Sequence, residues 1–274
     1  MTPTEIVGGF GVPHTPHYPS IVANGGPGAE EIAALYGEVR ARLEAAGPDV
    51  IVFLTSDHYN LFWETCIPIF SVAVAPSAWG ASDYDTIPRR ELPIASDLAV
   101  HVQRHLVRGG FDVGKSQELE LDHTIVAPMH FLAPGVDIPI VPVFVSALIP
   151  PLPTAARCHA FGRALREALD DADAGRVAIV TSGSFSLEIA GPRTADGNHV
   201  GVPDPSWMDR VLELLAAGDL DTLVAEATEE QLRAAGNAGG ETLLWIAMLA
   251  AAGGGTPDFL EAQRAAGHGY GAWV

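Results

Sequence analysis

Two histidines follow apolar runs that have the composition of buried strands. His14 comes after residues 6–12, and His58 comes after residues 50–54. A third run, residues 177–181, leads into serines and a glycine. In open α/β sheets, ligands bind at the carboxyl ends of the strands, so we expect these segments on one rim. Neutral imidazole is the commonest protein ligand for metals such as iron and zinc, so the placement predicts a metal site. The alternative is that each histidine is a hydrogen-bonded structural residue.

Two neighbours of these histidines have roles that the pattern leaves open. His17 lies three residues after His14 and is a rival for the same function. Asp57 precedes His58, where its carboxylate would orient an imidazole through a hydrogen bond. The alternative for Asp57 is a turn or a helix cap.

Glu241 is the candidate for a third metal ligand. It follows the pair Gly239-Gly240 and precedes an apolar segment over residues 242–252 that is typical of a buried helix. A glutamate in a first helical turn also stabilises the helix dipole, which is the alternative explanation. A carboxylate that enters the protein interior needs a cation or hydrogen-bond donors. The pattern therefore favours an acidic ligand at this position.

A further histidine, His123, follows Asp122 and precedes another apolar segment. In a site it would act as a general acid or base, or hydrogen-bond to a substrate. The alternative is that the two residues are a polar pair at the start of a helix.

Alternating strand-like and helix-like patterns predict the fold class. Apolar runs rich in β-branched residues predict buried strands over residues 50–54, 67–74, 138–145 and 177–181. Helical periodicity predicts helices over residues 29–46, 95–108, 155–172, 206–217 and 229–235. We expect an α/β protein with a central, mostly buried sheet flanked by helices on both faces, in a single domain over residues 1–274.

The composition excludes several classes of protein. The 274 residues carry a formal net charge of -19, which repels phosphate backbones, so we expect no nucleic-acid partner. A hydrophobic content of 48% excludes a mainly disordered chain. The sequence contains neither a secretory signal nor about 18 successive uncharged apolar residues, so we expect no membrane partner and a cytoplasmic location.

Cys66 and Cys158 are expected to be buried free thiols rather than a disulfide.

Taken together, these residues resemble the class III extradiol ring-cleaving dioxygenases, the family of the catalytic (beta) subunit of protocatechuate 4,5-dioxygenase. Each motif is weak alone, but their order and spacing match over nearly the whole chain. The matching segments are Pro13-His14-Thr15-Pro16, Ser56-Asp57-His58, Leu121-Asp122-His123, Gly191-Pro192-Arg193, and Gly239-Gly240-Glu241 with Leu244-Trp245.

The resemblance implies that His14, His58 and Glu241 hold one Fe(II) ion and leave positions open for substrate and oxygen. It implies that His123 contacts the substrate. That substrate would be a catechol-type aromatic (a dihydroxybenzoate, a catechol or an aminophenol), which is cleaved with O2. The family also includes proteins with a small partner subunit, so we expect either such a subunit or a homo-oligomer.

Arg193 and Tyr18 are candidates for further substrate contacts. Arg193 would pair with a substrate carboxylate, and Tyr18 would supply an aromatic wall. Ordinary structural roles are the alternatives for both residues.

One position departs from the family pattern. When Ser186 and Gly191 are aligned with the family's segments, Leu187 stands where the family carries its acid/base histidine. Loss of such a group typically lowers a rate by about 10²–10⁴-fold. Three explanations are open. The leucine was introduced into a chain that naturally has histidine, or His123 or Glu188 moves the proton on an unusual substrate, or ring cleavage has been lost.

We therefore expect a non-haem Fe(II)-dependent extradiol dioxygenase with Leu187 at the acid/base position. One alternative is a metal-binding, non-catalytic relative or subunit that binds an aromatic ligand without cleaving it. Another is a zinc hydrolase, because two histidines and a glutamate also suit Zn²⁺. The sequence has no HExxH motif, which argues against the hydrolase.

Overall fold

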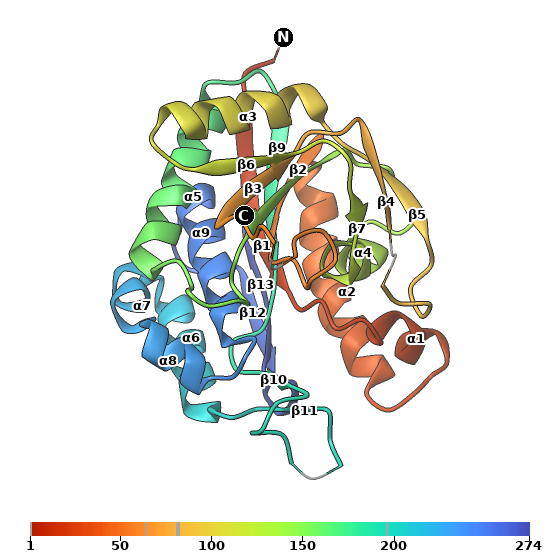
Figure 1. The fold of residues 1–274 in the computed structure, drawn as a ribbon. Helices are drawn as coiled ribbons and strands as arrows, with labels where there is room; N and C mark the ends of the chain where they lie inside the picture. Colours follow the sequence, from red (N-terminus) through yellow and green to blue (C-terminus); the bar gives the residue numbers. More distant parts are fainter. Residues whose placement is uncertain (1, 64, 81–82, 196) are drawn as a thin grey trace.

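The computed structural model of the chain describes residues 2–63, 65–80, 83–195 and 197–274, and its centre is an eight-stranded sheet (Figure 1). The strands are β1 (Glu5–Val12), β2 (Val50–Thr55), β3 (Phe70–Ala73), β6 (Val113–Ser116), β8 (Ile140–Val145), β9 (Arg176–Ser182), β12 (Phe259–Gln263) and β13 (His268–Trp273). Their order across the sheet is β12-β13-β1-β9-β2-β8-β3-β6. The middle strands β1, β9, β2 and β8 are parallel, whereas β13 and β3 pair in antiparallel fashion, so the sheet is mixed.

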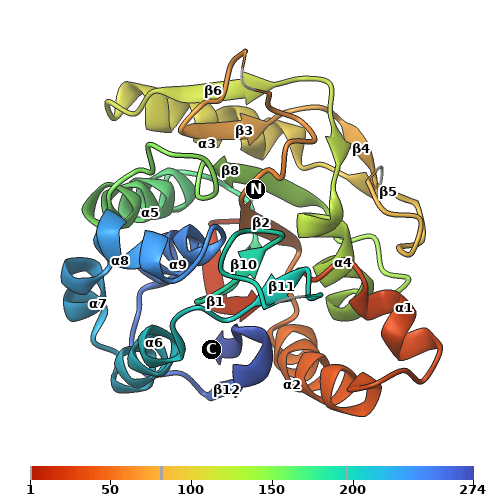
Figure 2. The ribbon, with the colours of Figure 1, turned by 60° about the horizontal axis from the view of Figure 1, so that its bottom comes forward.

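Helices cover both faces of this sheet (Figure 2). One face packs against α3 (Ser96–Arg108), α5 (Ala155–Asp170) and α9 (Thr242–Ala252), with α6 (Pro205–Ala217), α7 (Leu220–Glu226) and α8 (Glu229–Ala234) beside them. The other face packs against α1 (Tyr18–Ala23), α2 (Ala29–Ala46) and α4 (His123–Leu132). The predicted α/β class, with a buried sheet between two helical layers, is confirmed.

Strand β2 contributes side chains to two hydrophobic cores, one on each face of the sheet. Successive side chains of a strand point to opposite faces. Val52 and Leu54 therefore belong to the core on the α5 and α9 side, whereas Ile51 and Phe53 belong to the core on the α2 and α4 side. All four side chains are fully buried, so an uninterrupted apolar run is the sequence pattern that this strand needs.

Two smaller sheets lie outside the main one. The first contains β5 (Arg90–Pro93), β4 (Ser77–Gly80) and β7 (Glu120–Leu121), and the second pairs β10 (Glu188–Ile189) with β11 (Val200–Gly201). These strands have two to four residues each, too few for a period-2 pattern to stand out in the sequence.

Several boundaries differ from the sequence prediction. The strand expected over residues 67–74 begins only at Phe70, after Pro68, which has no amide to donate to a ladder. The helix expected over residues 155–172 ends at Asp170. Strand β13 was not predicted, because its glycines have low strand propensity. Antiparallel pairing with β1 holds it in the sheet.

Both cysteines of the chain have free thiols, as expected. Cys158 is buried, but Cys66 is exposed, so the prediction of burial was wrong for Cys66. Cys66 lies in the loop between β2 and β3, away from the apolar faces of the sheet strands. No helix among the described residues is long and apolar enough to span a bilayer.

Candidate metal centre

Two parallel strands and a 3₁₀ helix bring the candidate ligands to one rim of the sheet. His14 lies two residues after the end of β1, and His58 lies three residues after the end of β2. Strand β9 runs parallel between them. Glu241 reaches the same place from the short 3₁₀ helix Gly239–Glu241, directly before the buried helix α9. The expected convergence at the carboxyl ends of parallel strands is therefore present.

The side chains of these residues meet in a tight cluster. Glu241 Oε1 lies 3.1 Å from His14 Nε2 and 3.0 Å from His58 Nε2. His123 completes the group, because its ring centroid lies 4.9 Å from that of His58 and 5.6 Å from that of His14. Ring nitrogens of the three histidines lie within 4.8 Å of one another, close enough to share one metal ion.

The hydrogen bonds around His14 define its tautomer. Ser182 Oγ donates its only proton to the carbonyl oxygen of Thr124 at 2.7 Å. His14 Nδ1 lies 3.0 Å from the same Ser182 oxygen, so Nδ1 must carry a proton and donate it. In a neutral imidazole, the Nε2 atom then has a free lone pair. That lone pair faces Glu241, the orientation that a metal-ligating histidine requires.

The charges in the cluster are unevenly distributed. Burial would raise the pKa of Glu241, but the imidazoles of His14 and His58 outweigh it and hold this pKa well below its usual range. Burial lowers the pKa of His14 against the attraction of Glu241. The pKa of His58 is raised, because its hydrogen bond to Glu241 and nearby carboxylates outweigh burial. The cluster therefore favours an ionised Glu241, and it favours the protonated form more at His58 than at His14.

This arrangement fits a bound cation. When His14 is neutral and its Nδ1 donates to Ser182, the lone pair of Nε2 faces Glu241 Oε1 at 3.1 Å, which is unfavourable unless a cation bridges the two atoms. Two ligands at right angles, each about 2.1 Å from an ion, lie about 3.0 Å apart. The separations of 3.1 and 3.0 Å therefore match those of adjacent ligands around one metal.

The second oxygen of Glu241 is also held. Glu241 Oε2 accepts a hydrogen bond of 2.7 Å from the amide of Ser184. The approach requires glycine at the preceding position, because a Cβ on Gly183 would lie 2.7 Å from the Glu241 Cβ, and the φ of Gly183 is +154°. The glycine after β9 thus allows the loop to pass directly over the carboxylate.

His268 connects two of the loops that form the centre. Its Nε2 lies 2.8 Å from Thr15 Oγ1, and its Nδ1 lies 3.1 Å from Ser184 Oγ. Burial lowers the pKa of His268 to about 3, so this imidazole is neutral at physiological pH. It therefore joins the loop after β1 to the loop after β9 without adding charge.

His123 is held by a carboxylate from a distant loop. Its amide donates to Asp83 Oδ1 at 3.0 Å, and its Nδ1 donates to Asp83 Oδ2. The hydrogen bonds from His123 hold the pKa of Asp83 below its usual value against the effect of burial. Since Nδ1 is engaged, Nε2 is the nitrogen of His123 that remains available to the cluster.

The structure separates the roles that the sequence left open. His17 is exposed at the start of α1, so His14, not its rival, joins the cluster. Asp57 accepts hydrogen bonds from the amides of Leu61 and Phe62, which is the turn interpretation. The carboxylate that holds the backbone at His58 belongs to Asp122, which accepts a hydrogen bond from the His58 amide at 3.1 Å.

Arg193 has structural partners. Its Nη1 donates to the carbonyl oxygens of Arg233 and Ala234, and its Nη2 donates to Glu188 at 3.1 Å. Glu188 is 2% exposed, and its carboxylate packs where a Cβ on Gly191 would lie, which explains the glycine of the Gly-Pro-Arg segment. A substrate contact by Arg193 stays a prediction, and these bonds favour the structural alternative.

Tyr18 is buried among polar side chains from β12 and β13. Its hydroxyl donates to Gln263 at 3.1 Å, and its ring lies edge-on to His268 at a centroid distance of 5.8 Å. Burial raises the pKa of Tyr18 to about 12. These contacts favour a packing role, and its predicted place in a substrate wall stays a prediction.

Leu187 is half-buried, and its carbonyl oxygen accepts a hydrogen bond of 3.0 Å from the amide of Ala238. Among the described residues, the side chains that pack against the two cores do not include Leu187. Position 187 therefore lies in the loop that contacts Glu241 but does not support the core.

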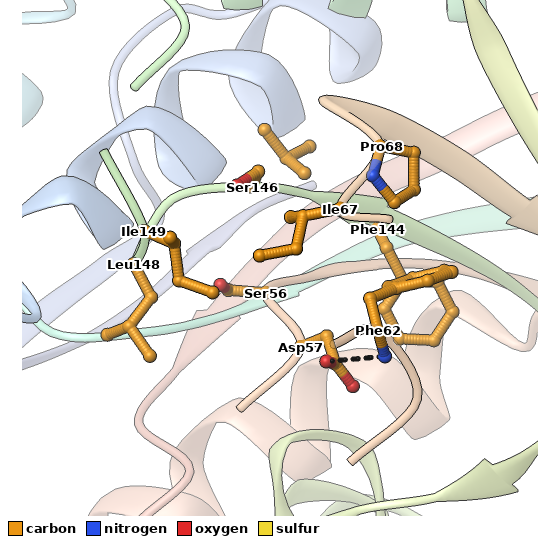
Figure 3. A pocket seen from close by; sticks show the side chains of 10 residues that line it. Ser56, Asp57, Phe62, Ile67, Pro68, Phe144, Ser146, Leu148 and Ile149 are labelled. Carbon is orange, nitrogen blue, oxygen red and sulfur yellow. Dashed lines mark hydrogen bonds between the residues drawn. The ribbon is translucent and has the colours of Figure 1, made fainter. Parts of the chain in front are cut away.

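A narrow apolar pocket lies behind the loop that carries His58 (Figure 3). Ser56 and Asp57 line it on the loop side, and Phe62, Ile67 and Phe144 are among the apolar side chains around it. The hydroxyl of Ser56 is buried without a hydrogen-bond partner among the described residues. The space open to the centre of a water molecule is about 10 Å³, enough for one water and too small for an aromatic ring.

Sequence reasoning missed several residues of the centre, namely Asp83, Ser182, His268 and the supporting role of Asp122. Only Ser182 had a usable signal, because it directly follows a predicted buried strand. Asp83 and His268 lie in segments for which no element was predicted.

The fold and the cluster define an α/β protein with a candidate metal centre at the carboxyl edge of its sheet. The family described as "Catalytic LigB subunit of aromatic ring-opening dioxygenase" matches residues 11–273, so the chain belongs to this family. The resemblance inferred from the motifs is thereby confirmed.

Individual relatives agree with this membership. A 2,3-dihydroxyphenylpropionate/2,3-dihydroxicinnamic acid 1,2-dioxygenase from Klebsiella pneumoniae (strain 342) is 26% identical over 261 residues, which cover 81% of this chain and 82% of that protein. The protein of the same description from Escherichia coli (strain K12 / DH10B) has the same identity and coverage. The solved structure of the uncharacterized protein JW3007 from Escherichia coli K12 has a TM-score of 0.59 at 15% identity, and the match covers 97% of this chain and 99% of that one. The solved structure supports the fold alone.

Proposed function

We propose that the chain is an Fe(II)-dependent extradiol dioxygenase that cleaves a catechol-type aromatic, with His14, His58 and Glu241 as the metal ligands. One observation carries the proposal. The fully buried carboxylate of Glu241 places a single oxygen 3.0–3.1 Å from two imidazole nitrogens. The resemblance and the names of the relatives favour iron over zinc, because zinc has no redox chemistry.

Fe(II) held in this way would supply a redox-active centre that accepts the two oxygens of a catechol and activates dioxygen. The protein residues would do the rest. Ser182 fixes the orientation of His14, and Ser184 and Gly183 hold the second oxygen of Glu241. The surrounding loops bury Glu241 completely and so exclude water from this side of the centre.

His123 is the residue that we assign to proton transfer. Its Nδ1 is bonded to Asp83, and its Nε2 remains as the atom that takes a proton from a substrate hydroxyl or returns it. Glu188 is a poor substitute, because its carboxylate is engaged by Arg193 and by the amide of Asn237. With Leu187 in place, one acid/base position of the family has no titratable group.

A non-catalytic, metal-binding relative is the second candidate, and Leu187 is the observation that favours it. A zinc site made of His14, His58 and His123 is a third, since these nitrogens also lie within reach of one ion. Metal analysis separates zinc from iron, and turnover separates a binding protein from an enzyme.

The test is oxygen uptake after anaerobic loading with Fe(II), Zn²⁺ or no metal. The panel should contain 2,3-dihydroxyphenylpropionate, 3,4-dihydroxybenzoate, catechol and 2-aminophenol. We expect oxygen consumption only with Fe(II) and a yellow ring-opened product from at least one compound. Bound iron without uptake on any compound would favour the non-catalytic candidate, and a chain that retains Zn²⁺ but not Fe(II) after desalting would favour the zinc site.

Two expectations about partners go with this proposal. The relatives imply an aromatic diol and O2 as substrates. Assembly as a homo-oligomer or with a small partner subunit stays a prediction, which size-exclusion chromatography with light scattering would test.

A further inference from the structure

A second group of side chains that could bind a metal lies between helix α3 and the end of helix α5, outside the centre described above. His101 and His105 are four residues apart on α3, so they lie on the same side of that helix. Asp171 is the C-cap residue of α5, which packs against α3. One ligand atom from each of the three residues lies within 4.8 Å of the others.

This group is separate from the candidate metal centre. Asp171 precedes the start of β9 at Arg176, whereas Ser182, which binds His14, is the last residue of β9. The two groups are therefore divided by the seven residues of this strand, or about 20 Å. In Figure 1, α3 lies at the end of the molecule where β9 begins.

The three side chains converge on one point. Asp171 Oδ2 lies 4.0 Å from His101 Nε2 and 3.8 Å from His105 Nδ1. Ligands around a tetrahedral Zn²⁺ lie about 3.3 Å apart, so closing the group around an ion takes movements of about 1 Å. The histidine side chains are 34% and 30% exposed and that of Asp171 is 72% exposed, so they have room to move.

The local charges also suit a cation. Among the described residues, no lysine or arginine pairs with Asp171, so its carboxylate has only the two imidazoles as partners. His101 Nε2 donates to the carbonyl oxygen of Ala168 at 2.9 Å, in the last turn of α5. The carbonyl end of a helix favours positive charge.

We propose that His101, His105 and Asp171 form a second metal site, which binds Zn²⁺ or a similar late first-row divalent ion. Two imidazoles and one carboxylate are a usual ligand set for such ions. When the ion binds, the imidazole of His101 gives up its hydrogen bond to Ala168 and carries its proton on Nδ1, so that Nε2 is free to ligate. Water or the carbonyl oxygen of Ala168 takes the fourth position. The site ties α3 to the end of α5 and has no part in the chemistry of the other centre.

The test counts bound Zn²⁺ by equilibrium dialysis at neutral pH. The variant with His101→Ala and His105→Ala should bind one equivalent less than the wild type. The Glu241→Gln variant should keep this equivalent, because its change lies in the other centre. Asp171→Asn, which retains the shape of the side chain, should weaken the site by at least about tenfold. His159→Ala, a half-buried histidine on α5, is the matched control and should bind as the wild type does.

Two further readouts confirm the assignment. Added Zn²⁺ should raise the melting temperature of the wild type more than that of the double variant, because an ion that binds only the folded state stabilises it. Oxygen uptake by the Fe(II)-loaded double variant should equal that of the wild type. The proposal is overturned if the double variant binds as much Zn²⁺ as the wild type, or if His159→Ala loses as much.

Discussion

The carboxylate of Asp83 accepts two hydrogen bonds from His123, one from the amide at 3.0 Å and one from the ring nitrogen Nδ1. The two residues are 40 positions apart in the chain. This pairing fixes both the tautomer and the direction of the imidazole, so that Nε2 is presented to the cluster. Asp83 is therefore a positioning residue for the proton transfer that we assign to His123.

Replacing Asp83 should slow turnover without removing the metal. We expect Asp83→Asn to lower kcat by roughly 10–100-fold, the usual cost of losing a hydrogen bond that orients a histidine in such a site. Bound iron and KM should change little, because Asp83 contacts neither His14 nor Glu241. The matched control is Asp85→Asn, an exposed aspartate in the same loop. Equal kcat in the two variants would contradict the positioning role.

The metal ligands can be tested by iron content. His14→Ala, His58→Ala and Glu241→Gln should each retain at most about a tenth of the iron after anaerobic loading and desalting, because each removes one of three donors. His17→Ala is the control, since His17 is exposed and lies outside the cluster. Normal iron occupancy in all three ligand variants would refute the assignment.

The serine behind His14 should also affect metal affinity. Ser182→Ala removes the acceptor for His14 Nδ1 and frees the ring to adopt the other tautomer. We expect iron affinity to fall by about 10–100-fold, measured by competition with a chelator. Ser71→Ala is a matched control, because Ser71 is equally buried in β3 and its hydroxyl has no hydrogen-bond partner among the described residues. An unchanged iron affinity in Ser182→Ala would show that the tautomer is set elsewhere.

A substitution at Leu187 tests whether this is the position of the family's acid/base histidine. Leu187→His should raise the rate of ring cleavage by at least about tenfold, within the usual range for such a group. The change should be tolerated, because Leu187 does not pack against either core. Leu187→Gln is the control for a polar side chain that does not titrate. A flat rate for the histidine variant, or an equal gain for glutamine, would mean that position 187 is not the vacant acid/base position.

His268 predicts a dependence of stability on pH. Burial lowers its pKa to about 3, whereas the ordinary value is 6.5. Between these values the unfolded chain binds a proton that the folded chain does not, so the free energy of unfolding falls as the pH is lowered through this window. One such group contributes at most about 1.4 kcal/mol per pH unit. Urea unfolding between pH 6.5 and 4 should give a shallower slope for His268→Gln, and equal slopes would contradict the prediction.

The sequence pointed to the candidate ligands of the centre, but not to most of the residues that support them. His14 and His58 could be located because each directly follows an apolar strand, and parallel strands end at one rim. Glu241 could be located because a glycine pair precedes it and a helix without charged residues follows it. This pattern indicates that the carboxylate enters the protein interior, where it needs a cation or hydrogen-bond donors. These signals are local, and they depend only on strand and helix patterns.

The supporting residues could not be located in this way. Asp83 meets His123 from 40 positions away, and Thr15 meets His268 across 253 positions. Such contacts depend on how irregular loops are folded over the sheet, and no periodic pattern encodes loop conformation. For the same reason the sequence left two roles open for Asp57 and for Arg193, and the observed contacts favour the structural role of each.

The sequence by itself therefore determined the fold class, through the alternation of buried strands and helices, and located the candidate ligands, through residue types at strand ends and before a buried helix. The departure at Leu187 follows from the resemblance to the family. Only the tertiary structure decided which nitrogen of His14 faces Glu241, which carboxylate orients His123, and that His101 and His105 meet Asp171. Each of these depends on hydrogen bonds or close contacts between segments that are distant in the chain, which form only when the sheet and its loops are assembled.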